Sequence, residues 1–456
     1  MNIAVIGAGI VGIATAYELA RDGHAVTVIE RRSSVASEAS FAHSGLAGAG
    51  AVLPWAAPGL PGGGATALLA RQTLLDTLKA PFDGQRRRWL WRSWRAGKAA
   101  FRSEREADLL RLARYSSERQ AELRTHLRLD DEHAQGSLVL LRSEADVARV
   151  QPSLAALRKL GIGVRELDAA ACHAIEPGLN RDQRLAGGLH LPGDSAGNSR
   201  QFAHLLRNAA ERCGAEFRFG SVARELVPGD GAGVQLRLEQ LALTTGFAVS
   251  HVAARGEAGV PTPLARRARA AARYLDPVSE ENFDALVIAA GAASAQWLSV
   301  LGVHVPLLPV HGYSLTAALR APERGPRAVV VDAQYQALIT RLGQRVRVAC
   351  GSELAGSTER HRPAAIDRLY TLLGDWFPGC AHLARPQLWK GTRALLPDGP
   401  PLIGASPRSG VWLNLGHGSS GGALACGSAR LLADRIAGRA PALDAAAFDL
   451  QRYTEG

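Results

Sequence analysis

The N-terminal segment constrains the fold of this chain more than any other part of it. An apolar, β-branched run at residues 2–6 leads into a glycine-rich turn at 7–12, and small and apolar side chains then recur at helical spacing over 13–22. A second apolar run at 25–30 ends in an acidic residue. This order predicts a buried strand, a tight turn, a helix and a second, parallel strand, which is the βαβ unit of nucleotide-binding α/β folds.

The turn follows the pattern G-x-G-x-x-G, in which each glycine has its own steric purpose. Gly7 permits the tight turn, Gly9 lets the backbone approach a pyrophosphate, and Gly12 lets the helix pack on the strand. The pyrophosphate would lie on the free N–H groups at the start of the helix, beside Ile10 and Val11. Because the turn follows a strand and opens a helix, we interpret it as a dinucleotide site; a purely structural turn is the alternative.

The end of the second strand bears on which dinucleotide binds. Glu30 would accept hydrogen bonds from ribose hydroxyls. Arg31 and the arginine after it could instead suggest the 2′-phosphate of NADP. However, residues 283–291 form a further apolar strand that ends in the glycine turn Ala290-Gly291, as flavoproteins use where the sheet meets the cofactor a second time. We therefore expect FAD.

Composition excludes several other classes of protein. The net charge is +11, but the 53 basic residues are scattered and only four are lysines, so we do not expect a nucleic-acid partner. The five cysteines lie far apart without a C-x-x-C pair, which argues against a metal site or a disulfide framework and for a reducing compartment. No apolar run could span a bilayer, and the N-terminus lacks the basic region of a signal peptide. We expect a cytoplasmic location.

The order of elements predicts an α/β fold with two domains that are discontinuous in sequence. A Rossmann-like FAD-binding domain would combine residues 1–50 with about 195–225, 283–300 and 391–440. An α+β substrate domain with a mixed or antiparallel sheet would combine about 51–190 and 301–390. Residues 231–282 pass through Gly-, Pro- and Arg-rich sequence with little apolar periodicity, which indicates an exposed insertion.

Several segments resemble a known family. They include VIGAGIVGIATAYELARDGHAVTVIER at 5–31, PWAAPG at 54–59, HGYSLT at 311–316, GTRALLPDGPPLIG at 391–404 and WLNLGHGSSGGALACGSARLLAD at 412–434. In these segments the chain resembles the bacterial D-amino acid dehydrogenases of the D-amino acid oxidase and glycine oxidase superfamily. The resemblance implies hydride transfer from the substrate Cα to flavin N5, hydrolysis of the imino acid to a 2-oxo acid and ammonia, and passage of electrons to a quinone or respiratory acceptor.

The residues leave two alternatives open. One is an oxidase of glycine, sarcosine or D-amino acids that uses oxygen, because oxygen reactivity depends on access to the flavin edge. The other is a flavin-binding subunit without amine turnover of its own.

An amino acid substrate carries a carboxylate, which a planar guanidinium can hold with two hydrogen bonds. The resemblance implies this role for Arg393, although Ala394 stands where the family usually has proline. Tyr313 lies on a strand that we expect to face the substrate, and its hydroxyl could contact the carboxylate; a packed core tyrosine is the alternative. His311 replaces a usual lysine and is interpreted as a loop histidine.

The resemblance also implies which residues surround the cofactor. Backbone N–H groups of the turn before the last helix would meet the flavin O2 edge. The loop at 40–46 would wrap the pyrophosphate and flavin, with His43 in place of the usual asparagine. We expect non-covalent FAD; a tether through His43 is the alternative. The expected cofactor-binding residues are Gly7, Gly9, Ile10, Val11, Gly12, Glu30, Arg31, Ser44, Gly45, Val222, Ala290, Gly291, Gly416, His417, Gly418 and Ser419.

The segment 86–101 interleaves arginines with Trp89, Trp91 and Trp94. On a helix, this pattern could make peripheral contact with an anionic membrane, at the inner face of the cytoplasmic membrane. We prefer the alternative of a substrate-domain helix whose tryptophans lie in the core.

Overall fold

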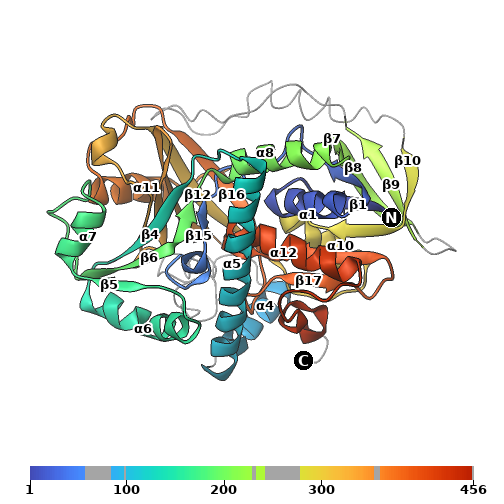
Figure 1. The fold of residues 1–456 in the computed structure, drawn as a ribbon, viewed down its shortest axis with the longest axis horizontal. Helices are drawn as coiled ribbons and strands as arrows, with labels where there is room; N and C mark the ends of the chain where they lie inside the picture. The colour runs from blue at the N-terminus through green and yellow to red at the C-terminus, as the bar shows by residue number, and fades with distance from the viewer. Residues whose placement is uncertain (57–83, 97–98, 228–232, 242–277, 354–359, 454–456) are drawn as a thin grey trace.

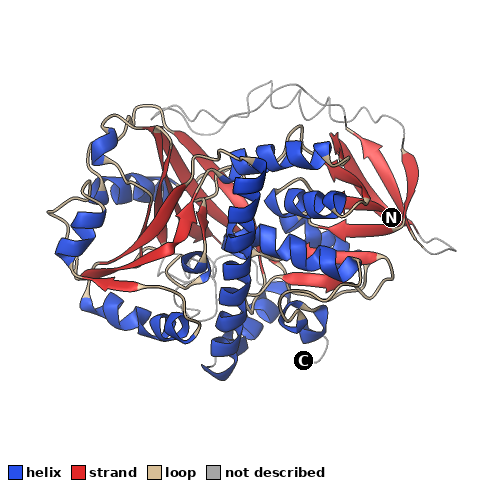
Figure 2. Cartoon of the chain, in the orientation of Figure 1, coloured by secondary structure: helices blue, strands red, loops and turns tan. Residues whose placement is uncertain are grey.

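The computed structural model describes residues 1–56, 84–96, 99–227, 233–241, 278–353 and 360–453. Within these residues the chain forms sheets of six, nine and three strands with helices packed on them (Figure 1). Figure 2 shows that strands fill both halves of the molecule and that helices cover them from outside. The expected α/β class with a mixed second sheet is confirmed.

The six-stranded sheet contains the N-terminal βαβ unit. β1 (Asn2–Ile6) pairs in parallel with β2 (Ala25–Glu30) on one side and with β11 (Ala285–Ile288) on the other. The outer strands are β7 (Glu216–Phe219) beside β2, then β18 (Val411–Leu415) and the antiparallel β17 (Leu402–Ala405) beyond β11. Residues from both ends of the chain therefore meet in one sheet, at whose carboxyl edge ligands bind in such folds.

Helices cover one face of this sheet. α1 (Ile10–Arg21) packs against α8 (Ser199–Arg212) and α12 (Gly421–Ile436), and the long α5 (Ala99–Leu127) lies along α12 (Figure 1). Small residues on α12, such as Ala425 and Ala429, are fully buried. They allow these helices to approach closely.

The other face of the sheet packs on α10 (Ser294–Val300) and on a three-stranded antiparallel sheet. Its strands are β8 (Ser221–Val227), β9 (Val234–Gln240) and β10 (Ser279–Phe283). Leu236 and Leu238 of β9 are buried, so the exposed insertion that we expected over 231–282 does not extend to its ends. Residues 242–277, which make up most of it, lie outside the described residues.

The nine-stranded sheet is mixed. Most neighbouring strands run antiparallel, whereas β13 and β4 pair in parallel. In spatial order its strands are β16 (Gln387–Leu395), β12 (Leu308–Ala318), β15 (Arg345–Glu353), β14 (Ala337–Leu342), β13 (Val329–Asp332), β4 (Ala134–Leu141), β6 (Gly187–Ala196) and β3 (Leu46–Ala47), with β5 (Arg165–Leu167) on β6. The remaining α-helices are α4 (Gly84–Ala96), α6 (Glu144–Lys159), α7 (Ala169–Ile175) and α11 (Pro363–Trp376). The short 3-10 helices are η1 (Ala49–Val52), η2 (Gly291–Ala293), η3 (Pro322–Arg324), η4 (Gly418–Ser420), η5 (Ala446–Phe448) and η6 (Leu450–Tyr453).

Two strands of the nine-stranded sheet depart from the expected domain division. β3 lies within residues 1–50, which were assigned to the FAD-binding domain. Residues 391–395 were assigned to the FAD-binding domain, but they belong to β16, which pairs along its whole length with β12 in the nine-stranded sheet. The ladder of backbone hydrogen bonds places this segment with the second sheet. The division into two discontinuous domains remains a proposal, with β16 as a strand that reaches from one towards the other.

Three helices are joined by a buried ionic network. Glu18 of α1 accepts hydrogen bonds from Arg119 of α5 at 2.8 Å and from Arg430 of α12 at 2.9 Å. Arg430 also pairs with Asp22 at 2.5 Å. Because an ionised carboxylate is costly to bury without such partners, the network favours the arrangement in which these helices meet.

Asp194 is a buried carboxylate without a cationic partner among the described residues. One oxygen accepts from Ser137 Oγ at 2.6 Å and the other from the Gly50 amide at 3.2 Å. Burial raises the pKa of Asp194 from 3.8 to about 6. The folded state therefore retains a proton that the unfolded state loses, and stability falls as pH rises through this interval.

We expect Asp194→Asn to remove this pH dependence. An asparagine oxygen can accept from Gly50, while its amide can donate to the Ser137 hydroxyl. Between pH 5 and pH 8 the wild type should lose roughly 1.4 kcal/mol of unfolding free energy that the variant keeps. Urea unfolding at the two pH values measures this difference, with the exposed Asp182→Asn as control. An equal pH response of Asp194→Asn and wild type would contradict the assignment.

Candidate functional site

The glycine-rich turn has the steric requirements that its pattern predicts. Gly7 has φ +103°, in the left-handed region. A Cβ on Gly12 would lie 1.9 Å from the Gly7 carbonyl oxygen, so the helix can approach the turn only through glycine. A Cβ on Gly9 would meet no protein atom closer than Ser40 Oγ at 3.6 Å. Space for a ligand, rather than protein packing, is therefore the reason that remains for glycine at position 9.

The start of α1 has features that suit an anion. Its N-cap, Gly9, has no side chain, and the first turn of the helix carries no acidic residue. The Ile10 amide donates to Ser40 Oγ at 3.2 Å. The positive end of the helix dipole thus faces the cleft without a compensating carboxylate in its first turn, which suits a pyrophosphate.

Glu30 lies at the end of β2 in the same cleft. Its carboxylate accepts from the Ala8 amide at 2.7 Å and from the Arg32 amide at 2.8 Å, and burial raises its pKa. Arg31 and Arg32 both pair with Glu38. Glu38 therefore already engages both arginines that could have held a 2′-phosphate, which supports the interpretation as an FAD site.

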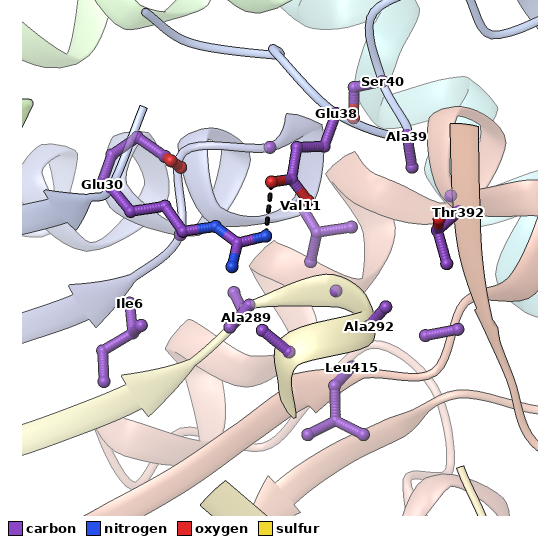
Figure 3. Close-up of a pocket in the computed structure, with 18 of the residues that line it drawn as sticks. Ile6, Val11, Glu30, Glu38, Ala39, Ser40, Ala289, Ala292, Thr392 and Leu415 are labelled. Atoms are coloured by element: carbon purple, nitrogen blue, oxygen red, sulfur yellow. Dashed lines mark hydrogen bonds and ion pairs between the residues drawn. The ribbon is translucent and has the colours of Figure 1, made fainter. Parts of the chain in front are cut away.

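These groups line a cleft of about 1210 Å³ that is open to solvent, at the carboxyl edge of the six-stranded sheet. Figure 3 shows that residues from distant segments, including Val11, Glu30, Ala289, Thr392 and Leu415, converge around it. Twelve of the sixteen expected cofactor residues line it: Gly7, Gly9, Ile10, Val11, Glu30, Arg31, Val222, Ala290, Gly291, Gly416, His417 and Gly418.

The other four expected residues lie elsewhere. Gly12 serves helix packing, as described above. Ser44 and Ser419 line a second cavity. Gly45 lines neither; a Cβ there would lie 2.0 Å from the Gly197 carbonyl oxygen, so glycine is required for packing between two loops.

The second cavity, of about 800 Å³, adjoins the first. Its walls come from the loop at 39–44 and from β12, β14, β15 and β16. The two cavities share Ile10, Ala39, Ser40, Arg393, Gly418 and Gly421. A cofactor in the first cleft would therefore face whatever molecule occupies the second.

Arg393 stands in the shared wall. Its Nη2 donates to the Gly351 carbonyl at 2.5 Å and to Ser352 Oγ at 3.1 Å, while its buried Nε has no partner. Among the described residues no carboxylate forms an ion pair with Arg393. Burial lowers the pKa of Arg393 to about 10. A Cβ on Gly312 would lie 3.1 Å from the guanidinium, so glycine there makes room for it. A buried cation without an anion is a site for an anionic ligand.

Tyr313 lines the second cavity, but its hydroxyl is already engaged. It donates to Glu353, whose carboxylate also pairs with Lys390 at 3.0 Å and with Arg362 at 3.3 Å. Burial and the adjacent Glu353 raise the pKa of Tyr313. Because the single hydroxyl proton is directed to Glu353, Tyr313 has no proton left to donate to a substrate carboxylate in this arrangement.

His43 joins two loops at the second cavity. Its Nε2 donates to the Ser419 carbonyl at 2.8 Å and its Nδ1 accepts from the Gly45 amide at 3.1 Å. Burial lowers the pKa of His43. Both ring nitrogens of the neutral imidazole thus have partners within the protein.

The turn before α12 presents backbone to the cleft. Gly416 and Gly418 have φ +80° and +58°. A Cβ on Gly416 would clash with Leu396 at 2.4 Å. His417 is buried, its Nε2 contacts Ser428 Oγ at 3.0 Å, and burial lowers its pKa to about 3. The imidazole is therefore neutral and packed, and the backbone is the part of this turn that faces a ligand.

Two residues that sequence reasoning missed also line the cavities. Asn414, at the end of β18, donates through Nδ2 to Thr15 Oγ1 at 2.9 Å, and its buried Oδ1 has no partner. Trp389 of β16 stacks on Phe41, with ring centroids 4.3 Å apart. A polar residue inside an otherwise apolar strand was the available signal for Asn414, whereas the Trp389–Phe41 contact joins segments too distant for any local signal.

His311 is also placed differently from our interpretation. It lies within β12, is buried, and its Nδ1 contacts Thr392 Oγ1 at 2.9 Å, so it is not a loop histidine. The pairing of β12 with β16 brings these two residues face to face.

Comparisons with known proteins indicate the same class of cofactor. A family model described as "FAD dependent oxidoreductase" matches residues 2–435. A D-amino acid dehydrogenase from Cereibacter sphaeroides is 37% identical, with 99% of this chain and 95% of the relative covered. One from Rhizorhabdus wittichii is 34% identical, with 99% and 100% covered.

Solved structures show the same fold. A glycine oxidase from Geobacillus kaustophilus has a TM-score of 0.72 at 21% identity, over 99% of this chain and 98% of that one. An L-proline dehydrogenase from P. horikoshii has a TM-score of 0.69 at 16% identity, over 100% of this chain and 98% of that one.

Proposed function

The chain belongs to the FAD-dependent oxidoreductase family, with D-amino acid dehydrogenases among its full-length relatives, and from this premise we propose that it oxidises D-amino acids to 2-oxo acids and ammonia. The observation that carries the proposal is Arg393, a partly buried guanidinium with which no carboxylate pairs among the described residues, in the wall between the two cavities. An α-carboxylate is the anion that this position would take.

The first cleft fits FAD. The amides at the start of α1 would hold the pyrophosphate and Glu30 the ribose, while backbone groups of Gly416 and Gly418 would face the flavin. FAD supplies the two-electron chemistry when bound. We propose non-covalent binding, since Ser419 and Gly45 already engage both ring nitrogens of His43.

The second cavity would hold the amino acid. Arg393 would bind its carboxylate and so direct Cα towards the shared wall and the first cleft. Tyr313 would form part of the cavity wall, with its hydroxyl kept by Glu353. The described lining of this cavity contains no acidic residue, so little competes with the substrate for Arg393.

For the electron acceptor we propose a quinone or another respiratory carrier. The full-length relatives at 34% and 37% identity are named dehydrogenases, whereas the glycine oxidase is 21% identical. The alternative, an oxidase that passes electrons to oxygen, predicts a different result in the test below. Among the described residues, no helix has the length and apolar character needed to cross a membrane.

The test is an anaerobic absorbance titration of the FAD-loaded protein with a panel of D- and L-amino acids. We expect D-amino acids, and not their L-enantiomers, to bleach the oxidised flavin spectrum, and a soluble quinone to restore it faster than oxygen does. Rapid reoxidation by oxygen with peroxide release would favour the oxidase. Bound FAD that no amino acid bleaches would favour a flavin-binding subunit and contradict the proposal.

A further inference from the structure

A third cavity, of about 570 Å³, lies apart from the two described above. Its walls come from α4, the start of α5, the loop after β16 and the C-terminal η6. Trp91 and Tyr453 contribute aromatic rings, and Arg92 and Arg95 contribute guanidinium groups. The cavity is thus aromatic and cationic at once, and the proposed reaction gives it no role so far.

The charges around this cavity do not balance. Its acidic residue, Asp398, already accepts from Tyr453 and pairs with Arg105 and with Arg452. Among the described residues, neither Arg92 nor Arg95 forms an ion pair. Arg92 lies 5.3 Å from the centroid of the Tyr453 ring. Arg95 lies 5.0 Å from that of Trp91. The cavity therefore carries two uncompensated positive charges beside aromatic faces.

Only a thin partition separates this cavity from the cofactor cleft. Ala394 lines the cleft, and Pro397, three residues later, lines the third cavity. Three residues span at most about 11 Å even when fully extended. The indole of Trp89 is buried and donates to the Leu395 carbonyl at 3.1 Å. A hydrogen bond therefore joins the helix that bears Arg92 and Arg95 to the segment between the two cavities.

The helix that supplies Trp91 to the cavity is apolar as well as basic at its surface. Trp91 is 52% exposed and Trp94 is 60% exposed on the same helix. The expectation that tryptophans of this segment lie in the core holds for Trp89 alone among the three. Exposed indoles beside arginines suit a ligand that is planar and apolar but carries oxygen acceptors.

We propose that this cavity binds the quinone that reoxidises the enzyme, an inference that rests on the proposed function. The ring would stack on Trp91 or Tyr453, and its carbonyl oxygens would accept hydrogen bonds from Arg92 and Arg95. The quinone takes up two electrons and two protons, so that both carbonyls become hydroxyls while the reduced cofactor returns to its oxidised form. Negative charge grows on the oxygens as electrons arrive, and the two arginines stabilise it.

The experiment separates the two halves of the reaction in the FAD-loaded protein. The double variant Arg92→Gln with Arg95→Gln is first reduced anaerobically with D-alanine and then mixed with menadione in a stopped-flow instrument. We expect reduction within twofold of wild type and reoxidation slowed at least tenfold. The matched control is Arg111→Gln with Arg114→Gln, two exposed arginines of α5 that pair with Asp108 and Glu118, and it should match wild type in both steps.

The outcomes are distinct. Unchanged reoxidation of the double variant by menadione would overturn the acceptor site. Unchanged reoxidation together with weaker binding to anionic phospholipid vesicles would overturn it too and identify a lipid contact instead. If D-amino acids fail to reduce even the wild type, the proposed function fails; dithionite reduction then still allows menadione reoxidation to be compared among the variants.

Discussion

Replacing Arg393 with leucine is expected to lower kcat/KM for D-amino acids by about a thousandfold. Loss of one partner from a buried, hydrogen-bonded charge pair costs about 2–5 kcal/mol, and about 4 kcal/mol corresponds to a thousandfold. The described residues offer the substrate carboxylate no second guanidinium in the second cavity's lining. Steady-state turnover with a quinone acceptor measures the effect, and the FAD content should stay near one per chain.

Lysine at position 393 is the matched control. It keeps the charge but not the planar pair of donors, so we expect a smaller loss, of about ten- to a hundredfold. Leucine should also raise the thermal unfolding midpoint of the substrate-free protein, because it removes a desolvated cation that no carboxylate in the described part of the chain compensates. Turnover by the leucine variant at a tenth of the wild-type rate or more would show that the carboxylate binds elsewhere.

Alanine at position 12 is expected to abolish tight FAD binding. Its Cβ would lie 1.9 Å from the Gly7 carbonyl oxygen, so α1 would have to move away from the turn. Such overpacking costs about 1–3 kcal/mol or more, and it displaces the amides that would hold the pyrophosphate. Calorimetric titration of FAD into cofactor-free protein should show affinity lowered at least a hundredfold.

Gly374 provides the comparison for this change. It lies within α11, and a Cβ there would meet no atom within 4 Å. Gly374→Ala should therefore bind FAD like the wild type and gain about 0.5–1 kcal/mol of stability from helix propensity. If Gly12→Ala bound FAD with wild-type affinity, the close approach of helix and turn would not be required for the site.

Interactions between near neighbours in the chain could be predicted well. The strand at 2–6 and the turn after it match β1 and the start of α1, because apolar alternation and glycine spacing report directly on local geometry. The second apolar run at 25–30 is β2, and the strand expected within 283–291 is β11. Each of these elements is specified by its own side chains.

Contacts between distant segments could not be predicted in this way. Arg31 could be interpreted as a phosphate ligand until Glu38 was found beside it. The hydroxyl of Tyr313 could by sequence contact a substrate carboxylate or belong to a packed core tyrosine. Its proton is directed to Glu353, forty residues later, because β12 and β15 pair in the same sheet. A side chain's free hydrogen-bonding capacity depends on every neighbour, and most neighbours are remote in sequence.

By itself, then, the sequence determined the βαβ unit, the cofactor class and the family, since these depend on residue types at short, regular spacings. Only the tertiary structure decided which arginines carry uncompensated charge. Arg430 is neutralised by Glu18 and Asp22, whereas Arg393, Arg92 and Arg95 have no such partner among the described residues. The reason is physical: an arginine has the same charge everywhere in the sequence, and folding alone selects the carboxylates that come within reach of it.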